Sequence, residues 1–367
     1  MISRRGVLIA AGLTVLPSRA VAAPSIVKPL PASDFIVRGT NAETRWEALR
    51  DVGSLVPVSK FFVRNHTSTP VLDATSWRLE IFGSGVTRPL SLSLRDLRAL
   101  PSCSVEAVIE CAGNGRSFFT SQQGQNVAGT PWTLGAVGNA RWRGVPLGVL
   151  LRLAGLRRSA VDVLPAGLDP EYVTGGVNLG RVRRPLPVSK ALDDVLVAYE
   201  MNGADLPVDH GYPARLVVPG WAGIASIKWL GSLEVSTTPL HSPWDTDFYR
   251  LLGPSYPAEG TLVTSQVTKS AFELGWGATL PAGRRLLTGR AWGPAGVRRV
   301  SVSTDGRTWR RATPVSRDGW TRWQIPWLAT PGEHVLRVRA DDQPEVAPCN
   351  TQGYLFGAVV RHPVTVV

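Results

Sequence analysis

The chain has 367 residues, 44% of them hydrophobic, which is enough for one large or two ordinary domains with a sizeable core. Its net charge of +12 favours an anionic ligand or an acidic partner, but the 40 Lys and Arg residues are scattered, without a basic run or zinc-finger spacing, and this argues against nucleic-acid binding. The three cysteines form no Cys-x-x-Cys or Cys-x-x-Cys-His motif, so no iron–sulfur cluster, zinc ribbon or covalent c-type haem is encoded.

Residues 1–22 have the pattern of an export leader. Arg4 and Arg5 precede an apolar run at 6–16, and a small-residue cleavage site follows at 20–22. The run is too short to cross a bilayer, and no other candidate follows, so the sequence predicts no membrane span. The arginine pair is similar to a twin-arginine signal, which predicts a periplasmic protein. The alternative is an ordinary secretory leader with an accidental arginine pair.

The first part of the mature chain is expected to carry short strands separated by loops. A Pro-rich stretch at 23–58 should wrap the surface, and strand-like runs follow at 61–63 and 77–82. Arg64 and His66 lie between these runs, on a predicted loop. A short amphipathic helix is predicted at 92–100.

A cysteine then stands at a predicted strand-to-turn corner. Apolar and polar residues alternate through 104–110, and the strand runs into Cys111 and an Ala-Gly-Asn-Gly turn. Arg116 follows closely enough to fold back toward the same place. A thiolate beside a cation can ligate a soft metal, whereas a lone cysteine in such a turn can equally be a buried, inert thiol.

Helices at 148–154 and 187–193 and strands at 161–164, 195–199, 214–218 and 230–236 complete the first predicted domain. Arg215 interrupts an otherwise apolar strand, and its burial would demand an anionic partner.

From about residue 258 the pattern changes to short strands with turn signals between them. They are expected at 261–263, 286–292, 297–303, 309–312, 321–325, 332–340 and 353–359. Seven short strands over about a hundred residues are typical of an Ig-like β-sandwich. Cys103 and Cys349 are read as structural, with a disulfide between them as the alternative.

Four segments, in order, resemble the sulfite oxidase family of molybdenum enzymes. Glu110–Arg116 is similar to its Cys-Ala-Gly-Asn motif, and Phe61–His66 to its Phe-x-Arg-Asn-His segment. The segments 209–220 and 226–230 resemble its pterin-binding segment and the stretch that follows. The resemblance implies an α+β protein with a mixed-sheet molybdopterin-binding domain at 23–250. An Ig-like β-sandwich at 251–367 would then form a homodimer.

The resemblance also implies roles for individual residues. Cys111 would be the one protein ligand of molybdenum, Arg64 and Arg116 would bind the anionic substrate, and Tyr249 would stand at the mouth of the substrate pocket. Other residues would hold molybdopterin: Val63, Arg64, Asn65, His66, Asp169, His210, Arg215, Ser226, Ile227 and Lys228. The implied reaction is oxidation of sulfite to sulfate, with electrons passed to an external c-type cytochrome because the chain has no haem motif.

The sequence departs from the family in places. Gly115 stands where animal members have a second arginine, and the family's late arginine has only Arg322 as a candidate, out of register by about one residue. Three alternatives are therefore kept: a periplasmic methionine sulfoxide reductase, a sulfane dehydrogenase subunit with the same cofactor, and a cofactor-free binding protein.

Overall fold

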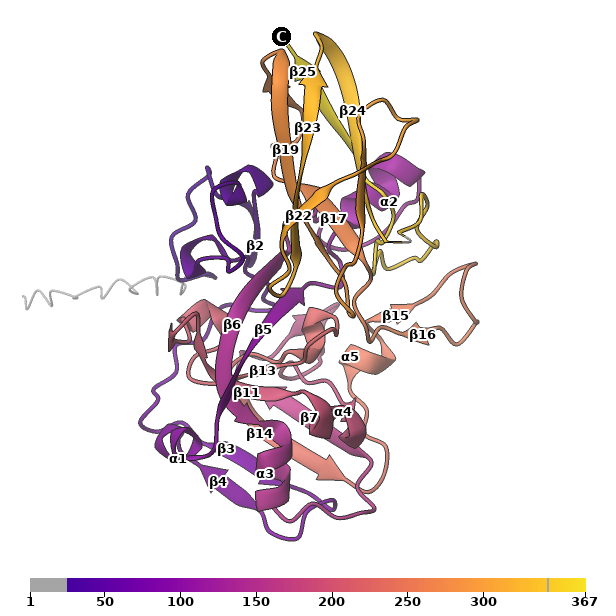
Figure 1. Cartoon of the computed structure of the whole chain (residues 1–367). Helices are drawn as coiled ribbons and strands as arrows, with labels where there is room; N and C mark the ends of the chain where they lie inside the picture. The colour runs from indigo at the N-terminus through magenta and orange to yellow at the C-terminus, as the bar shows by residue number, and fades with distance from the viewer. Residues whose placement is uncertain (1–24, 342) are drawn as a thin grey trace, which may run out of the picture.

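The computed structural model describes residues 25–341 and 343–367, so the predicted leader lies outside the described residues. Two mixed or antiparallel sheets form the lower part of the molecule, and a β-sandwich of C-terminal strands stands above them (Figure 1). The long strands β5 (Cys103–Glu110) and β6 (Val137–Pro146) run between the two parts. This arrangement confirms the predicted α+β fold class.

The first sheet has the order β10-β7-β14-β3-β4, and only the β14–β3 pair is parallel. Its strands are β3 (Leu79–Phe82), β4 (Leu90–Leu92), β7 (Asp162–Gly167), β10 (Leu186–Pro187) and β14 (Leu230–Ser236). Antiparallel strands make the second sheet, in the order β12-β11-β6-β5, with β13 paired to β11. They are β5 (Cys103–Glu110), β6 (Val137–Pro146), β11 (Leu196–Met201), β12 (Ala204–Asp205) and β13 (Arg215–Val217).

The helices are short and lie at the ends of strands. They are α1 (Leu94–Ala99), α2 (Arg116–Gln123), α3 (Leu147–Leu153), α4 (Val188–Asp193) and α5 (Pro243–Thr246). Ser93 caps α1 in a capping box with Asp96, which explains why the predicted helix begins there. None of the described helices has the length and apolarity needed to cross a membrane. Small hairpins complete this part: β1 (Phe35–Arg38) with β2 (Asn41–Thr44), and β8 (Val173–Thr174) with β9 (Val177–Asn178).

The C-terminal part is a sandwich of a four-stranded and a five-stranded sheet. The four-stranded sheet has the order β17-β19-β23-β22, with β17 (Lys269–Phe272), β19 (Gly283–Trp292), β22 (Thr313–Ser316) and β23 (Thr321–Ala329). The other has the order β18-β25-β24-β20-β21, with β18 (Ala278–Leu280), β20 (Val300–Ser303), β21 (Arg310–Arg311), β24 (Gly332–Ala340) and β25 (Arg361–Val366). The predicted sandwich is therefore present.

Two predicted strands are wrong, and a third is present but lies outside the predicted sandwich. Residues 353–359 form no strand, because Leu355 has a φ of 54° and its N–H bonds to Ala112 O at 2.7 Å instead of joining a ladder. Within 61–63 only Val63 pairs, in a single bridge to Ala42. The strand near 261–263 is β16 (Thr261–Leu262), which pairs with β15 (Arg250–Leu251) outside the sandwich.

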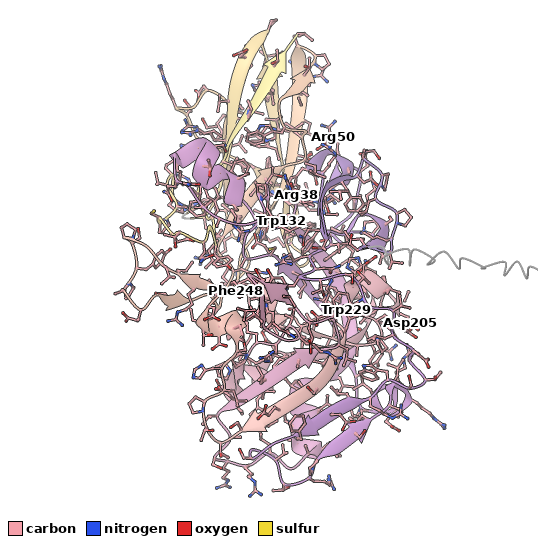
Figure 2. The ribbon with its side chains drawn as sticks, turned by 180° about the vertical axis from the view of Figure 1, so that it is seen from behind. Arg38, Arg50, Trp132, Asp205, Trp229 and Phe248 are labelled. Atoms are coloured by element: carbon pink, nitrogen blue, oxygen red, sulfur yellow. The ribbon has the colours of Figure 1, made fainter. Side chains whose placement is uncertain are left out.

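One of the hydrophobic clusters spans the two parts of the chain. Phe118 and Phe119 on α2, and Trp142 on β6, pack in the same buried cluster as Trp292, Trp320 and Phe356 of the C-terminal part. Figure 2 shows Trp132, Phe248 and Trp229 at the waist of the molecule, between the sandwich and the lower sheets. The waist is also where the candidate site lies.

Candidate active site

Cys111 stands at the end of β5, as the sequence predicts. Its side chain is buried, and its N–H bonds to Ala136 O at 2.9 Å. The turn that follows is fixed by Asn114, whose amide donates to Glu110 Oε1 at 2.9 Å and accepts from Ala136 N–H at 3.0 Å. Gly113 allows Arg116 to fold back over the turn, because a Cβ there would lie 2.7 Å from the guanidinium. The thiol is thus held in one place by backbone and side-chain bonds.

The C-terminal part also reaches this turn. Lys269 on β17 donates to Glu110 Oε1 at 2.7 Å and to Asn114 O at 2.8 Å. The side chains of Lys269 and Glu110 are only 2% and 3% exposed, so this is a buried ion pair between the two parts of the chain. It braces the residue before Cys111 and the turn after it.

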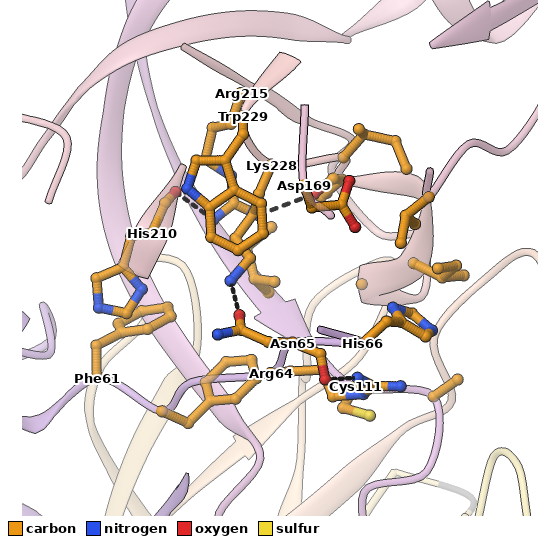
Figure 3. A pocket seen from close by; sticks show the side chains of 18 of the residues that line it. Phe61, Arg64, Asn65, His66, Cys111, Asp169, His210, Arg215, Lys228 and Trp229 are labelled. Atoms are coloured by element: carbon orange, nitrogen blue, oxygen red, sulfur yellow. Dashed lines mark hydrogen bonds between the residues drawn. The ribbon is translucent and has the colours of Figure 1, made fainter. Parts of the chain in front are cut away.

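Two cavities meet at Cys111. The first cavity encloses about 720 Å³ of empty space, part of which is open to solvent. Its polar lining is shown in Figure 3, where the sulfur of Cys111 lies at the bottom beside Arg64. The residues that line it include Phe61, Arg64, Asn65, His66, Cys111, Asp169, His210, Arg215, Ser226, Ile227, Lys228, Trp229 and Tyr249.

Two cations, the buried Arg215 and the part-buried Lys228, line the first cavity without an ion-pair partner among the described residues. Within the described chain, Arg215 donates to backbone oxygens, those of His210 and Ser226 at 3.0 Å and of Leu216 at 3.2 Å. Lys228 donates to Asn65 Oδ1 and to Asp209 O, the latter at 2.7 Å. Burial lowers the pKa of Arg215 to about 9, and burial and the charge of Arg215 lower the pKa of Lys228 well below its usual range. An anionic ligand in the cavity would stabilise the charged form of both side chains.

Two further polar groups in this cavity lack partners. Asp169 Oδ1 and His210 Nε2 are buried, and no described residue bonds to either atom. Burial raises the pKa of Asp169 to about 6 and lowers the pKa of His210 well below its usual range. Buried polar atoms in native proteins are nearly always paired, so these two atoms are available to a ligand in the cavity that carries hydrogen-bond donors and acceptors.

The beginning of the described chain covers the wall behind His210. The backbone N–H groups of Val27 and Lys28 donate to the buried carboxylate of Asp209 at 2.7–3.1 Å, and Thr69 Oγ1 donates to it at 2.6 Å. Lys28 also donates to Val58 O at 3.0 Å and to Phe61 O. Residues 25–28 therefore form a strap that fixes the segment carrying His210.

The second cavity has about 760 Å³ of empty volume and shares four residues with the first: Arg64, His66, Cys111 and Tyr249. Its other lining residues include Arg116, Thr130, Trp132, Tyr172, Phe248, Gln352 and Tyr354. Arg116 is buried and is held by Gln352 O and Gly353 O, both at 3.2 Å, and by Thr130 O at 3.1 Å. Neither Arg64 nor Arg116 forms an ion pair with a described carboxylate, and Trp132 Nε1 is buried without a partner. The cavity thus offers positive charge and N–H donors to a small anion.

Tyr249 stands where the two cavities join. Its backbone has a φ of 56°, and its ring stacks on Tyr354 at 4.9 Å. Its hydroxyl lies 3.2 Å from His66 Nε2. Burial raises the pKa of Tyr249 above its usual range, so the hydroxyl keeps its proton and can donate a hydrogen bond.

Comparison with known proteins shows to which family this chain is similar. Residues 66–244 match the model of the oxidoreductase molybdopterin binding domain. Sulfite oxidase of Arabidopsis thaliana is 32% identical over 298 residues, covering 76% of this chain and 75% of the relative. The chain belongs to the sulfite oxidase family. Rat (Rattus norvegicus) mitochondrial sulfite oxidase is 35% identical over 364 residues, or 90% of this chain, and the chain spans 65% of the length of that relative.

This chain is also similar to a protein of known structure. The sulfane dehydrogenase SoxCD from Paracoccus pantotrophus matches with a TM-score of 0.79 and 27% identity, over 93% of this chain and 91% of that chain. The matches imply a molybdopterin oxidoreductase of sulfite oxidase type that uses the molybdenum cofactor. The first cavity fits that cofactor, because its unpaired cations and orphaned polar atoms suit an anionic, hydrogen-bonding group.

Of the residues expected from the family motifs to hold the cofactor, all except Val63 line the first cavity. Arg215 and Lys228 would bind its anionic group, Asp169 and His210 would hydrogen-bond to it, and Cys111 would ligate the metal. Bound there, the cofactor supplies two-electron redox chemistry. Among the described residues, no group of three or more His, Cys, Asp or Glu lies together as an alternative metal site.

Two predicted residues lie elsewhere. Val63 is buried among Ile26, Phe35 and Ala42 and lines neither cavity. Arg322 lies on β23 opposite Arg290 and is also outside both cavities. Cys103, Cys111 and Cys349 are free thiols, so the alternative disulfide is absent.

The structure adds residues that sequence reasoning missed. Gln352 and Tyr354 are the C-terminal residues that reach the second cavity, in place of the expected late arginine. Trp132, Tyr172, Trp229 and Trp244 surround the site, and Trp244 donates from Nε1 to His66 Nε2 at 3.2 Å. The orphaned Nε1 of Trp132 is visible only in the fold, and nothing in the sequence distinguishes it from the other tryptophans.

Proposed function

We propose that this chain oxidises sulfite to sulfate and passes the electrons to an external c-type cytochrome. The observation that carries the proposal is the pair Arg64 and Arg116. Neither charge has a carboxylate partner in the described part of the chain, and both side chains line the second cavity beside Cys111. A small dianion such as sulfite needs fixed cations in a site with little water.

The reaction assigns a task to each residue of the second cavity. Sulfite and water yield sulfate, two protons and two electrons. Arg64 and Arg116 hold the anion, while Tyr249 and Trp132 direct an O–H and an N–H toward its oxygens. The aromatic walls limit water at the reacting atom. The electrons leave to an external acceptor because the chain has no haem motif.

The test uses mature protein from a host that makes molybdopterin. We expect about one molybdenum per chain and sulfite-dependent reduction of cytochrome c. Arg116→Gln should keep its molybdenum and raise KM for sulfite at least tenfold, since one charge-assisted contact contributes roughly 1.5–3 kcal/mol. Arg98→Gln, on the exposed α1, removes the same charge far from both cavities and is the matched control. Bound molybdenum with no sulfite oxidation would refute the proposal.

The likeness to SoxCD favours a second candidate, oxidation of a sulfane sulfur. Gln352 and Tyr354 make the C-terminal side of the second cavity neutral, which suits a substrate with less charge than sulfite. A cysteine persulfide, as the probe for a protein-bound sulfane sulfur, separates the two in the same cytochrome assay, because a sulfane dehydrogenase would oxidise the sulfane group and leave free sulfite unreacted.

We also propose a homodimer formed by the C-terminal sandwich and a periplasmic location reached by twin-arginine export. Leu286 and Leu328 are 58% and 67% exposed, and they lie on neighbouring strands, β19 and β23, of one sheet. An exposed apolar face of this kind suits a second copy of the chain. Replacing Arg4 and Arg5 with Lys should retain the protein in the cytoplasm, and unchanged export would refute the twin-arginine route.

A further inference from the structure

Two hydrogen-bond donors face a single nitrogen of His66. Trp244 Nε1 and the Tyr249 hydroxyl oxygen both lie 3.2 Å from His66 Nε2. An indole N–H can only donate, so Nε2 must be the acceptor and carries no proton. A neutral His66 then has its proton on Nδ1.

This arrangement also decides what the Tyr249 hydroxyl can do. An unprotonated imidazole nitrogen has one lone pair, and Trp244 already donates to it. His66 Nε2 therefore does not need a hydrogen bond from the Tyr249 hydroxyl. The hydroxyl can rotate toward the second cavity, which Tyr249, Arg64 and Cys111 all line. Without the indole N–H, Nε2 would bind the hydroxyl instead.

We propose that Trp244 is a positioning residue that holds His66 in the Nδ1–H tautomer and leaves the Tyr249 hydroxyl to donate to the bound substrate. The kinetic part of this proposal rests on the proposed sulfite oxidation, whereas the tautomer does not.

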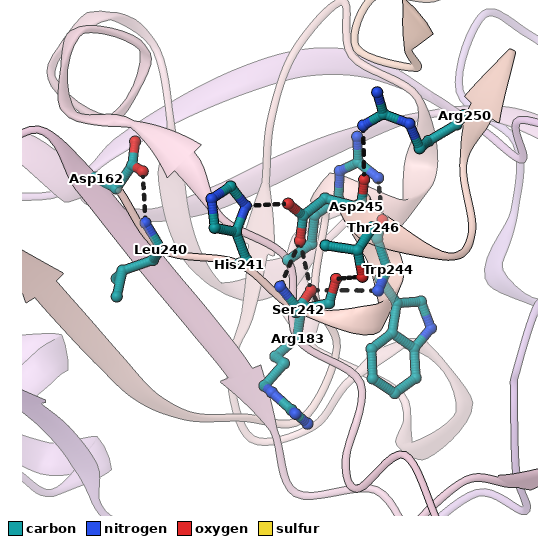
Figure 4. A network of polar contacts seen from close by, with 10 residues as sticks. Asp162, Arg183, Leu240, His241, Ser242, Trp244, Asp245, Thr246 and Arg250 are labelled. Carbon is teal, nitrogen blue, oxygen red and sulfur yellow. Dashed lines mark hydrogen bonds and ion pairs between the residues drawn. The ribbon is translucent and has the colours of Figure 1, made fainter. Parts of the chain in front are cut away.

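The fold holds Trp244 firmly enough for this task. Trp244 is the second residue of α5, which Ser242 begins with a capping box to Asp245 (Figure 4). Buried Arg184 donates to Trp244 O and to Val263 O, and its guanidinium lies 5.7 Å from the centre of the Tyr249 ring. The indole meets His66 edge-on, at 90° and 5.8 Å between ring centres. Trp244 and Tyr249 are thus fixed by the same arginine.

The tautomer is tested first, on the intact holoenzyme. The chain has five histidines, so histidine labelled with nitrogen-15 gives few signals, and the His66→Gln variant identifies those of His66. Long-range proton–nitrogen spectra distinguish a protonated Nδ1 from a protonated Nε2. We expect Nδ1 to carry the proton. A proton on Nε2 would overturn the proposal whether or not the enzyme oxidises sulfite.

The kinetic test is a double-mutant cycle. Trp244→Phe keeps an aromatic ring but removes the N–H, and it should lower kcat/KM for sulfite roughly tenfold, mainly through kcat, by the loss of about one hydrogen bond. Tyr249→Phe should lose a similar factor. The double variant should be within about twofold of Tyr249→Phe, because both changes remove the same donor. Losses that multiply to about a hundredfold would overturn the proposal.

Trp77→Phe is the matched control. Trp77 is buried and also donates from its indole, to Leu230 O at 2.9 Å, but it lines neither cavity. This variant should keep the kcat/KM of the wild type. If Trp244→Phe loses molybdenum or thermal stability, the nitrogen-15 spectrum of the wild type still decides between the two tautomers. Failure of wild-type protein to oxidise sulfite would refute the proposed function alone.

Discussion

Replacing Lys269 with Met should lower the free energy of unfolding strongly, although Lys269 lies on a strand of the C-terminal part. Lys269 and Glu110 are 2.7 Å apart and almost fully buried, and among the described residues the further side-chain donor to the carboxylate is the Asn114 amide. Removing one partner of such a pair leaves an uncompensated charge, which costs roughly 3–5 kcal/mol. Asn114 O would also lose a donor. Because Glu110 precedes Cys111, we expect lower molybdenum content as well.

The assay is urea unfolding of the purified variants, followed by tryptophan fluorescence, with molybdenum measured in parallel. The double variant Lys269→Met with Glu110→Gln should regain more than half of the loss, because the unpaired charge is gone. Asp205→Asn is the control: Asp205 pairs with Arg98 at 2.5 Å, but the side chains are 56% and 39% exposed, so the change should cost less than about 1 kcal/mol. A loss below about 1 kcal/mol for Lys269→Met would refute the reasoning.

Three further predictions test other features. Asp209→Asn removes the carboxylate that accepts hydrogen bonds from the N–H groups of Val27 and Lys28, so the free energy of unfolding should fall by about 1–3 kcal/mol. Proteases should also cut the strap of residues 25–28 faster, and mass spectrometry of the fragments checks this. The pKa of Asp169 is about 6, above its value of about 3.9 in the unfolded chain, so the folded protein binds this proton more tightly. The free energy of unfolding of the cofactor-free protein should therefore fall as pH rises from about 4 to 6. Urea titrations at each pH should show this fall, and Asp169→Asn should abolish it. Leu328→Glu should convert a dimer to monomers in light scattering, whereas Leu192→Glu, at an exposed position on α4, should not; unchanged mass would refute the proposed interface.

Site residues that lie on short motifs could be predicted from the sequence, because residues close to them in the chain determine their geometry. Cys111 ends a strand whose alternation is visible, and its turn is bonded within Glu110–Arg116 and to the next strand. Arg215 was predicted to need an anion because it interrupts an apolar strand, and the structure places it in the first cavity without a carboxylate. Such inferences need only the period of a strand and the cost of burying a charge.

The rest of the site depends on contacts that the sequence does not display. Tyr354 reaches Tyr249 only because Asn350 bonds to its backbone N–H and C=O, both at 2.9 Å, and turns the chain back. The apolar run at 353–359 resembles a strand, yet Phe356 is used to pack against Phe118 and Phe119 at 5.6 and 5.0 Å between ring centres. Periodicity reports that such residues are buried, but not which partner buries them.

The loop of residues 350–354 has a consequence for the order in which the enzyme matures. It supplies Tyr354 and the carbonyl groups that anchor Arg116, and it lies near the end of the chain. The ribosome makes the Cys111 turn long before these residues, and the N-terminal parts of a chain generally fold first. The second cavity is therefore completed only after residues 350–354 have been synthesised. A chain released before that point would hold the metal ligand but no finished place for a substrate.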